Sequence, residues 1–331
     1  MSKAVRLSNI ELLRILAIVL IVMMHAAGYI TKSSCDTNRM VLAAINVVGN
    51  MGVTVFVLIS GFFGIRFRWS GLLRLWLVML FYAVGILAFK VSMNEAVVDA
   101  AAVIKALTPV TSQTWWFMTC YVILYLLSPF VNLLVERLSR RQLLTLLGIM
   151  AFFYVLSPTF LLHELTDDMH GKGLPNMLTA YLLGRYVARW GWPSWFERHC
   201  GTLYLAIVVV LYLLTTLVAN IFCRDNNLLI VVGALSLFCW TAKHPFRVAW
   251  VNQLAAYVFP LYLTNTTILH ELSGEYQPLM NSVSVWPAFV QVLLAVLLLS
   301  FAVETVRRLL FDKPIDLLCQ KINHLSNSEP S

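Results

Sequence analysis

Long apolar runs separated by short polar turns dominate this chain. Ten runs stand out, and most are long enough for a helix that crosses the hydrocarbon core of a bilayer, which takes about 20 residues. They lie near residues 9–30, 41–64, 71–90, 115–135, 141–162, 174–190, 202–222, 227–242, 251–272 and 285–309. The pattern predicts an all-α, polytopic integral membrane protein with about ten transmembrane helices around an internal cavity.

The composition points in the same direction. Of the 331 residues, 60% are hydrophobic and only 12% are charged, whereas a soluble domain carries about 25% charged residues. An ordinary cytosolic enzyme, a disordered chain and a fibrous repeat are therefore excluded, and the lipid bilayer is the expected partner. No linker divides the chain, so we expect residues 1–331 to form a single transmembrane domain without a C-terminal extramembrane domain.

The basic residues predict how the spans are oriented. If the N-terminus is cytoplasmic, the inward segments hold 17 Lys and Arg, the outward segments hold 6, and Arg14 lies within the first span. Cytoplasmic loops carry an excess of Lys and Arg, so this count favours ten spans with both termini in the cytoplasm. The net charge of +8 is then an orientation signal, and no nucleic-acid partner is expected. A cleaved signal peptide is the competing interpretation of the first run, but its removal would leave nine spans and spoil the alternation.

The first span carries two ionisable side chains on one face. Arg14 and His25 are eleven residues apart, which is about three helical turns and about 16 Å along the axis. Ser8 and Glu11 match a capping box at the start of the helix, and Glu11 is spaced to pair with Arg14. Ionisable groups at membrane depth usually face a cavity and serve a reaction or a pathway. The alternatives are that Arg14 reaches the inner headgroups and that His25 is an interfacial, hydrogen-bonded histidine.

The pair Arg14-x10-His25 resembles the signature of the membrane acyltransferase-3 family, which acylates carbohydrates and lipids. Four later segments resemble that family in the same order: VFVLISGFF (55–63), the basic IRFRWSGLLR (65–74), QTWWFMTCYVILYLLSPFVN (113–132) and YVFPLYLTNTTILHEL (257–272). One position departs from the family, because the late helix often carries His where this chain has Asn265. An Asn can form hydrogen bonds but cannot act as an acid or a base at neutral pH.

The resemblance implies a transmembrane O-acyltransferase of the bacterial cytoplasmic (inner) membrane, and an O-acetyltransferase first of all. The donor would be acetyl-CoA or another short acyl-CoA, and the acceptor a hydroxyl of a cell-surface polysaccharide or its lipid-linked precursor. His25 is the candidate general base or acyl carrier, because the pKa of an imidazole lies near neutrality. Arg14 is the second catalytic candidate: it could bind the donor, orient His25 through intermediaries or stabilise the thioester oxyanion, and its distance of about 16 Å from His25 favours binding the donor. A transporter or flippase of sugars or lipids is the alternative, since intramembrane polar groups and a Pro-interrupted helix also suit transport.

Arginines at one inward turn are candidates for binding the donor. Arg66, Arg68 and Arg74 could contact the phosphates of coenzyme A through charge-assisted hydrogen bonds. Inward turns are basic in any case, so orientation signalling alone also accounts for them.

Further candidates lie on the fourth and ninth spans. Trp115 and Trp116 could pack against a sugar ring or belong to an interfacial aromatic belt. Tyr262 and Asn265 share a helical face and could line the cavity or make ordinary interhelical hydrogen bonds. Pro260 is expected to kink this span.

Small and polar residues elsewhere have simpler interpretations. Ser60 and Gly61 are expected to let two helices approach closely. The outward loop holds a group of possible metal ligands, but a metal site needs closed geometry from them and none is expected. That group consists of His163, Glu164, Asp167, Asp168 and His170.

Overall fold

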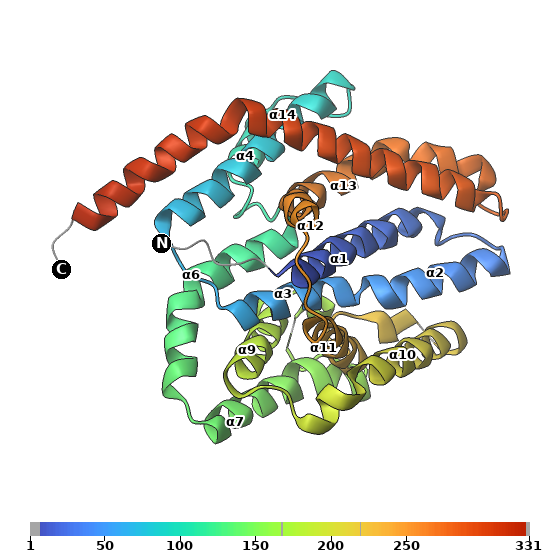
Figure 1. Ribbon diagram of the computed structural model, residues 1–331. Helices are drawn as coiled ribbons and strands as arrows, with labels where there is room; N and C mark the ends of the chain where they lie inside the picture. The colour runs from blue at the N-terminus through green and yellow to red at the C-terminus, as the bar shows by residue number, and fades with distance from the viewer. Residues whose placement is uncertain (1–6, 167, 219, 329–331) are drawn as a thin grey trace.

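The computed structural model describes residues 7–166, 168–218 and 220–328, and this part of the chain is helical, with no strand. The all-α prediction is confirmed (Figure 1). The helices are α1 (Ser8–Ala27), α2 (Asp36–Gly49), α3 (Met51–Phe63), α4 (Trp69–Ser92), α5 (Ala100–Leu107), α6 (Trp116–Arg137), α7 (Arg140–Ala151), α8 (Ser157–Phe160), α9 (Leu174–Trp190), α10 (Ser194–Leu217), α11 (Leu228–Ala242), α12 (Ala249–Leu254), α13 (Val258–Leu272) and α14 (Val285–Ser328).

Within the described residues, seven helical segments are long and apolar enough to cross a membrane, fewer than the ten predicted. The other three apolar runs are also helical, but α9 has 17 residues and α11 has 15. The ninth run is divided into α12, a 3-10 turn at Ala255–Tyr257 and α13. The structure therefore supports a membrane-embedded protein with several spans. The seven segments are Ser8–Ile30, Asp36–Phe63, Trp69–Ser92, Trp116–Arg137, Arg140–Phe160, Ser194–Leu217 and Val285–Ile322.

Helix α1 is the centre of the arrangement. It lies between α13 and α14 on one side and α3 and α11 on the other (Figure 1). Its N-terminal half packs Ile10 and Leu13 into one core cluster, and its C-terminal half packs Ile21 and Val22 into a second. A helix that is apolar around most of its circumference is buried on several sides, as α1 is here.

The break in the ninth run has a local cause at Pro260. Proline lacks the N–H that would bond to the carbonyl four residues earlier, that of Ala256. The Nη2 of Arg308 donates to that carbonyl instead, at 2.5 Å. Pro260 itself lies in the first turn of α13, just after the 3-10 turn that divides the run, and α14 satisfies the carbonyl that it leaves free.

The expected close approach at Gly61 is present between α3 and α9. A Cβ on Gly61 would lie 2.1 Å from the Tyr181 carbonyl oxygen, and a Cβ on Gly184 would lie 2.4 Å from the Leu58 carbonyl oxygen. Only glycine allows two helix backbones to meet at this distance. Ser60, by contrast, does not serve packing alone, since it faces the cavity described below.

The predicted capping box at the start of α1 is wrong. Leu7 occupies the N-cap position, with no side-chain cap. The Ser8 hydroxyl instead accepts a hydrogen bond from the Val248 N–H at 2.8 Å and lies 3.1 Å from Asn252 Oδ1. Because Ser8 is fully buried, its hydroxyl bonds to the segment packed against it rather than to its own helix.

Candidate functional site

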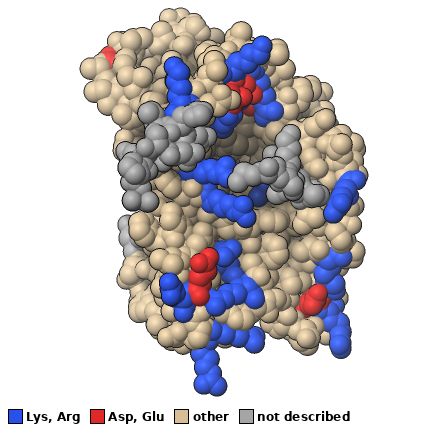
Figure 2. Space-filling model, turned by 60° about the vertical axis from the view of Figure 1, so that its left-hand side comes forward, with Lys and Arg blue, Asp and Glu red and all other residues tan. Residues whose placement is uncertain are grey.

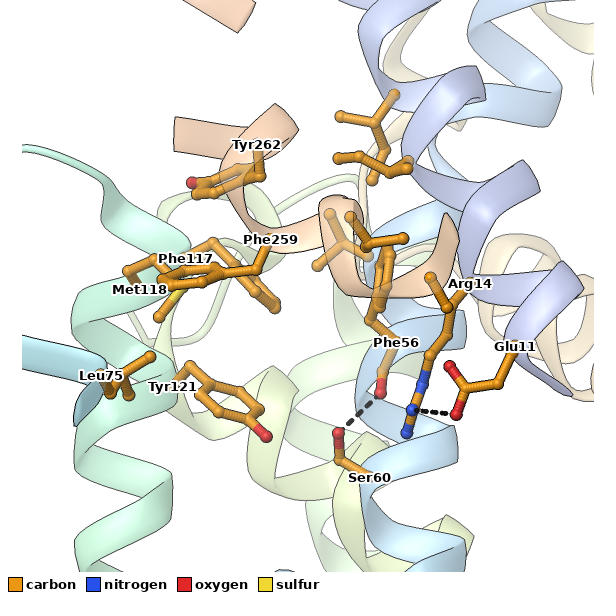
Figure 3. Close-up of a pocket in the computed structure, with 15 residues that line it drawn as sticks. Glu11, Arg14, Phe56, Ser60, Leu75, Phe117, Met118, Tyr121, Phe259 and Tyr262 are labelled. Atoms are coloured by element: carbon orange, nitrogen blue, oxygen red, sulfur yellow. Dashed lines mark hydrogen bonds and ion pairs between the residues drawn. The ribbon is translucent and has the colours of Figure 1, made fainter. Parts of the chain in front are cut away.

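A cavity of about 320 Å³ lies between α1, α3, α4, α6 and the α12–α13 segment. Its walls are largely apolar and aromatic. Polar groups enter it from α1, α3, α6 and α13 (Figure 3). These polar residues are Glu11, Arg14, Ser60, Tyr121 and Tyr262.

Arg14 faces this cavity. Its guanidinium pairs with Glu11 at 3.1 Å, as the spacing predicted. Figure 3 shows the guanidinium reaching toward Ser60, and the Tyr121 hydroxyl pointing toward the same serine. Tyr121 also lies within electrostatic reach of Arg14. One cation and two hydroxyls therefore converge at this end of the cavity, and the lining position favours the cavity over the headgroup interpretation of Arg14.

His25 lies on the same face of α1 as the residues that line the cavity. It is one turn beyond the last of them, Ile21, and is not itself part of the cavity wall. Its Nδ1 lies 2.8 Å from Oδ1 of Asn265. Asn265 follows Tyr262, a residue that lines the cavity, by three residues on α13. The hydrogen bond therefore joins the face of α1 that lines the cavity to the face of α13 that lines it. The predicted shared face of α1 is thus present. The residues of α1 that line the cavity are Glu11, Arg14, Ile18 and Ile21.

The surroundings of Asn265 set the proton position on His25. Asn265 is fully buried, and its Nδ2 donates to the carbonyls of Leu261, at 3.1 Å, and Tyr262, at 2.6 Å. The amide oxygen is therefore the atom that faces His25, and an oxygen there can only accept. We assign the imidazole proton to Nδ1, which leaves the lone pair on Nε2.

The two tryptophan candidates lie outside the cavity walls. Trp115 is buried, and its indole N–H donates to the Leu263 carbonyl at 3.1 Å, which holds α6 against α13. Trp116 is half-buried and packs edge-on against Phe117. Phe117 is the residue of this segment that lines the cavity, and its ring stacks on Tyr121 with 5.9 Å between centroids.

Two of the three candidate arginines line a second depression, of about 450 Å³. Arg68 and Arg74 form its walls with Tyr125 and the end of α14, where Asp316 pairs with Arg74. Arg66 is exposed and lies outside these walls. Lys and Arg side chains gather on the face where α4 begins and where α6 and α14 end (Figure 2).

The depression and the cavity adjoin along α4 and α6. Tyr125 lines the depression and Tyr121 lines the cavity, and four residues on a helix correspond to about 6 Å along its axis. On α4, Arg74 lines the depression and Leu75 lines the cavity. A ligand seated at the arginines therefore lies about one helical turn from the cavity.

The loop that carries Glu164 and His170, which was predicted to face outward, packs against the start of α11. Glu164 Oε1 accepts from Asn226 Nδ2 at 2.7 Å and lies 3.4 Å from His170 Nδ1. Burial raises the pKa of Asp225 to about 7, with Asp168 adding to the shift and Lys172 opposing it. Asp167, one of the metal ligands considered, lies outside the described residues.

Sequence reasoning missed two aromatic residues of the cavity wall, Tyr121 and Phe259. Tyr121 was not singled out, although it lies four residues after Phe117 and therefore on the same face of α6. Phe259, which lines the cavity from α13, precedes Pro260 and carried no signal of its own.

The fold and the site together define a helical membrane protein with Arg14 in the wall of an internal cavity and His25 one turn of α1 beyond that wall. The acyltransferase domain of the acyltransferase-3 family matches residues 7–305, and the chain belongs to that family. It is a membrane acyltransferase in this general sense. Comparison with curated proteins gave no match, and comparison with solved structures gave none either.

Proposed function

We propose that the protein is an O-acyltransferase that moves an acetyl group from acetyl-CoA to a hydroxyl of a cell-surface polysaccharide or its lipid-linked precursor. The observation that carries the proposal is the hydrogen bond between His25 and Asn265 on the face of α1 that also carries Arg14. In this proposal the chain lies in the bacterial inner membrane with ten spans and both termini in the cytoplasm, and α9, α11 and the α12–α13 segment complete the count.

The donor enters from the face rich in Lys and Arg. Arg68 and Arg74 contact the phosphates of coenzyme A, because guanidinium groups form charge-assisted hydrogen bonds with phosphate oxygens. The pantetheine arm then passes Tyr125 and Tyr121 into the cavity. The guanidinium of Arg14 has further N–H groups besides the one that bonds to Glu11. These N–H groups bind the pantetheine arm or the thioester oxygen.

His25 acts as the general base. Its Nε2 takes the proton of the acceptor hydroxyl while that oxygen attacks the thioester carbonyl carbon. The C–S bond then breaks, and the imidazolium returns the proton to the thiolate of coenzyme A. A relay through an acyl-histidine would use the same nitrogen. The two routes can be distinguished with labelled acetyl-CoA, because only the relay leaves labelled acetyl on the protein when the reaction is quenched.

The acceptor approaches from the side opposite the arginines. The aromatic rings of Phe117 and Tyr262, 5.5 Å apart, form a surface against which a sugar ring can pack. Asn265 occupies the position where family members often carry His. Its amide oxygen supports the remaining histidine, which is a role in hydrogen bonding rather than proton transfer.

Mass spectrometry of the acceptor glycan tests the proposal. Cells that carry His25→Gln should make the glycan without its acyl ester, while the protein reaches the membrane in the normal amount. His199→Gln is the matched control, because His199 is an exposed histidine of α10 that bonds only to the turn before it. It should leave the ester in place.

Two results would overturn the proposal. One is an ester that persists in His25→Gln at the level found with the unaltered protein. The other is an unchanged ester pattern combined with a loss of glycan from the cell surface when the protein is removed, because that pattern indicates transport. The mass of the ester lost would also identify the acyl group directly.

A further inference from the structure

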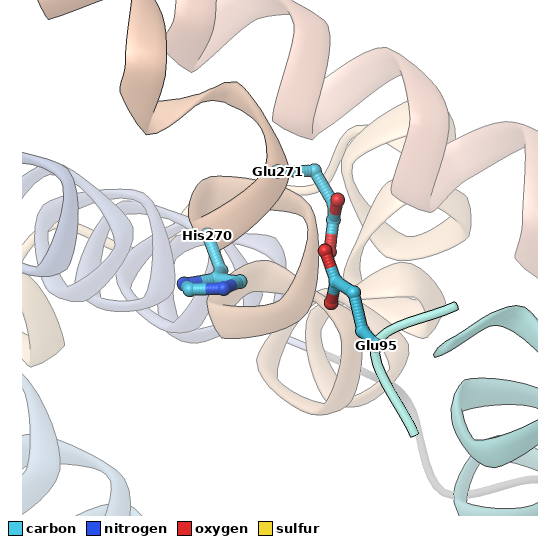
Figure 4. A group of neighbouring side chains, drawn as sticks. All are labelled: Glu95, His270 and Glu271. Atoms are coloured by element: carbon cyan, nitrogen blue, oxygen red, sulfur yellow. The ribbon is translucent and has the colours of Figure 1, made fainter. Parts of the chain in front are cut away.

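Three potential metal ligands come together at the end of the molecule opposite the arginine depression. Glu95 follows α4, and His270 and Glu271 lie near the end of α13. One ligand atom from each lies within 4.8 Å of the other two (Figure 4). The set combines an imidazole with two carboxylates and is therefore more than a surface group of acidic residues.

The backbone before Glu95 is held in a fixed conformation. Asn94 has a left-handed φ of 60°. Its N–H bonds to the Val91 carbonyl at 3.1 Å, and the Glu95 N–H bonds to the Lys90 carbonyl at 2.9 Å. These two bonds form a Schellman motif, which ends a helix in one defined way. Glu95 is therefore presented toward α13 by a built turn rather than by a free loop.

Glu271 carries the second indication of a ligand. Its Oε1 is buried and has no hydrogen-bond partner within the described residues. The side chain borders an apolar groove of about 460 Å³ between α4, α13 and α14, and Figure 4 shows its carboxylate directed toward Glu95. A buried carboxylate oxygen without a partner is costly, and a bound cation removes that cost together with the repulsion between two neighbouring carboxylates.

The ion pairs found among the described residues leave both carboxylates unused. Glu95 and Glu271 appear in none of them. Zinc accepts His nitrogen and carboxylate oxygen at about 2.0–2.2 Å. Atoms within 4.8 Å of one another reach that geometry through rotation of the exposed side chains of Glu95 and His270.

We propose that Glu95, His270 and Glu271 form a divalent-metal site that suits Zn²⁺ and joins the end of α4 to the end of α13. His270 is five residues beyond Asn265, about 140° further round the helix, so the metal lies away from the cavity. Its effect on the reaction is indirect, because it fixes the helix that carries Asn265. The proposal stands apart from the acyl-transfer chemistry and can be tested without it.

Zinc binding to the purified full-length protein in detergent tests the site, with a purification tag that contains no histidine. Glu95→Gln and His270→Gln should each weaken Zn²⁺ binding at least about tenfold, measured by titration calorimetry. Glu275→Gln is the control for the carboxylate, since it is exposed on the next turn. His170→Gln is the control for the imidazole, because that exposed histidine lies beside Glu164. Both controls should bind Zn²⁺ as the unaltered protein does.

Three outcomes would refute the metal site. In the first, the unaltered protein shows no saturable Zn²⁺ binding. In the second, the His270→Gln variant binds Zn²⁺ as tightly as the unaltered protein. Binding could also be lost in His170→Gln alone, which would place the ion in the other outward loop. Thermal unfolding of each variant without added metal shows whether a loss of binding reflects misfolding, and a Glu95→Gln protein that unfolds at the normal temperature keeps the test decisive.

Discussion

Replacing Asn265 with Leu is the sharpest test of how His25 is held. Leucine has the same number and branching of side-chain heavy atoms as asparagine but offers no acceptor, so the Nδ1–H of the imidazole loses its partner at 2.8 Å. The ring can then rotate, and its proton can move to Nε2, the nitrogen that the reaction needs free. Substrate binding should be little affected, because Arg14, Arg68 and Arg74 remain in place.

The magnitude follows from the hydrogen bond. A neutral hydrogen bond contributes about 0.5–1.5 kcal/mol net, and each 1.36 kcal/mol is tenfold in rate. Loss of the bond alone therefore lowers kcat by about 2- to 13-fold, and loss of the correct tautomer lowers it further. We expect kcat to fall about 10- to 100-fold, with the KM for acetyl-CoA changed less than threefold.

The assay is the initial rate of coenzyme A release by the purified protein over a range of acetyl-CoA concentrations, in the presence of acceptor. Thr264→Val is the matched control. Thr264 is the neighbouring buried residue, and its hydroxyl lies 2.7 Å from that of Ser300, away from His25. It should lower stability and leave kcat close to normal. A kcat within twofold of normal in Asn265→Leu would refute the role assigned to Asn265, and so would a rise in KM at constant kcat.

Three further predictions concern stability and the donor. The pKa of Asp225 is raised to about 7, so the folded protein keeps a proton that the unfolded chain releases above about pH 4. The stabilisation from this bound proton is therefore full at low pH and is lost as the pH rises toward 7, by at most about 4 kcal/mol. In Asp225→Asn, the melting temperature should change less between about pH 4 and 7 than in the unaltered protein. Parallel curves of melting temperature against pH would contradict the reasoning. Gly61→Ala should cost about 1–3 kcal/mol or more in thermal unfolding, whereas Gly148→Ala, where a Cβ meets nothing within 4 Å, should cost none, and equal melting temperatures would count against the close contact. Arg74→Gln should raise the KM for acetyl-CoA about fivefold and Arg66→Gln should not, so equal effects in kinetic assays would remove the depression as the donor site.

The fold was largely predictable because lipid imposes one pattern on every span. Where the structure describes them, all ten apolar runs are largely helical, since a backbone in hydrocarbon must satisfy its own hydrogen bonds. The number of spans was less predictable. α11 is apolar but only 15 residues long. Neighbouring helices can hold such a short helix in a bundle, and the sequence of that segment alone does not show those neighbours.

Residues whose role depends on distant contacts were the ones misjudged. Ser8 has the spacing of a cap, but its partners lie some 240 residues away in the chain. The aromatic segment shows the same limit: Trp115, Trp116 and Phe117 follow one another, and successive residues on a helix point about 100° apart. Composition identified the segment as aromatic, whereas only the packing of α6 on α13 decides that Phe117 is the one that faces the cavity.

In the proposed reaction, the position of Asn265 explains why a departure from the family pattern need not abolish activity. A general base requires one free nitrogen and one held nitrogen, and the group that holds it can be any acceptor that is itself fixed. Asn265 meets this requirement because two backbone carbonyls, those of Leu261 and Tyr262, hold its amide nitrogen. Both carbonyls belong to α13, which begins at Val258. The asparagine and the histidine therefore act as one unit in the proposed reaction, and the two carbonyls of α13 that hold the amide of Asn265 decide which nitrogen of His25 can accept a proton.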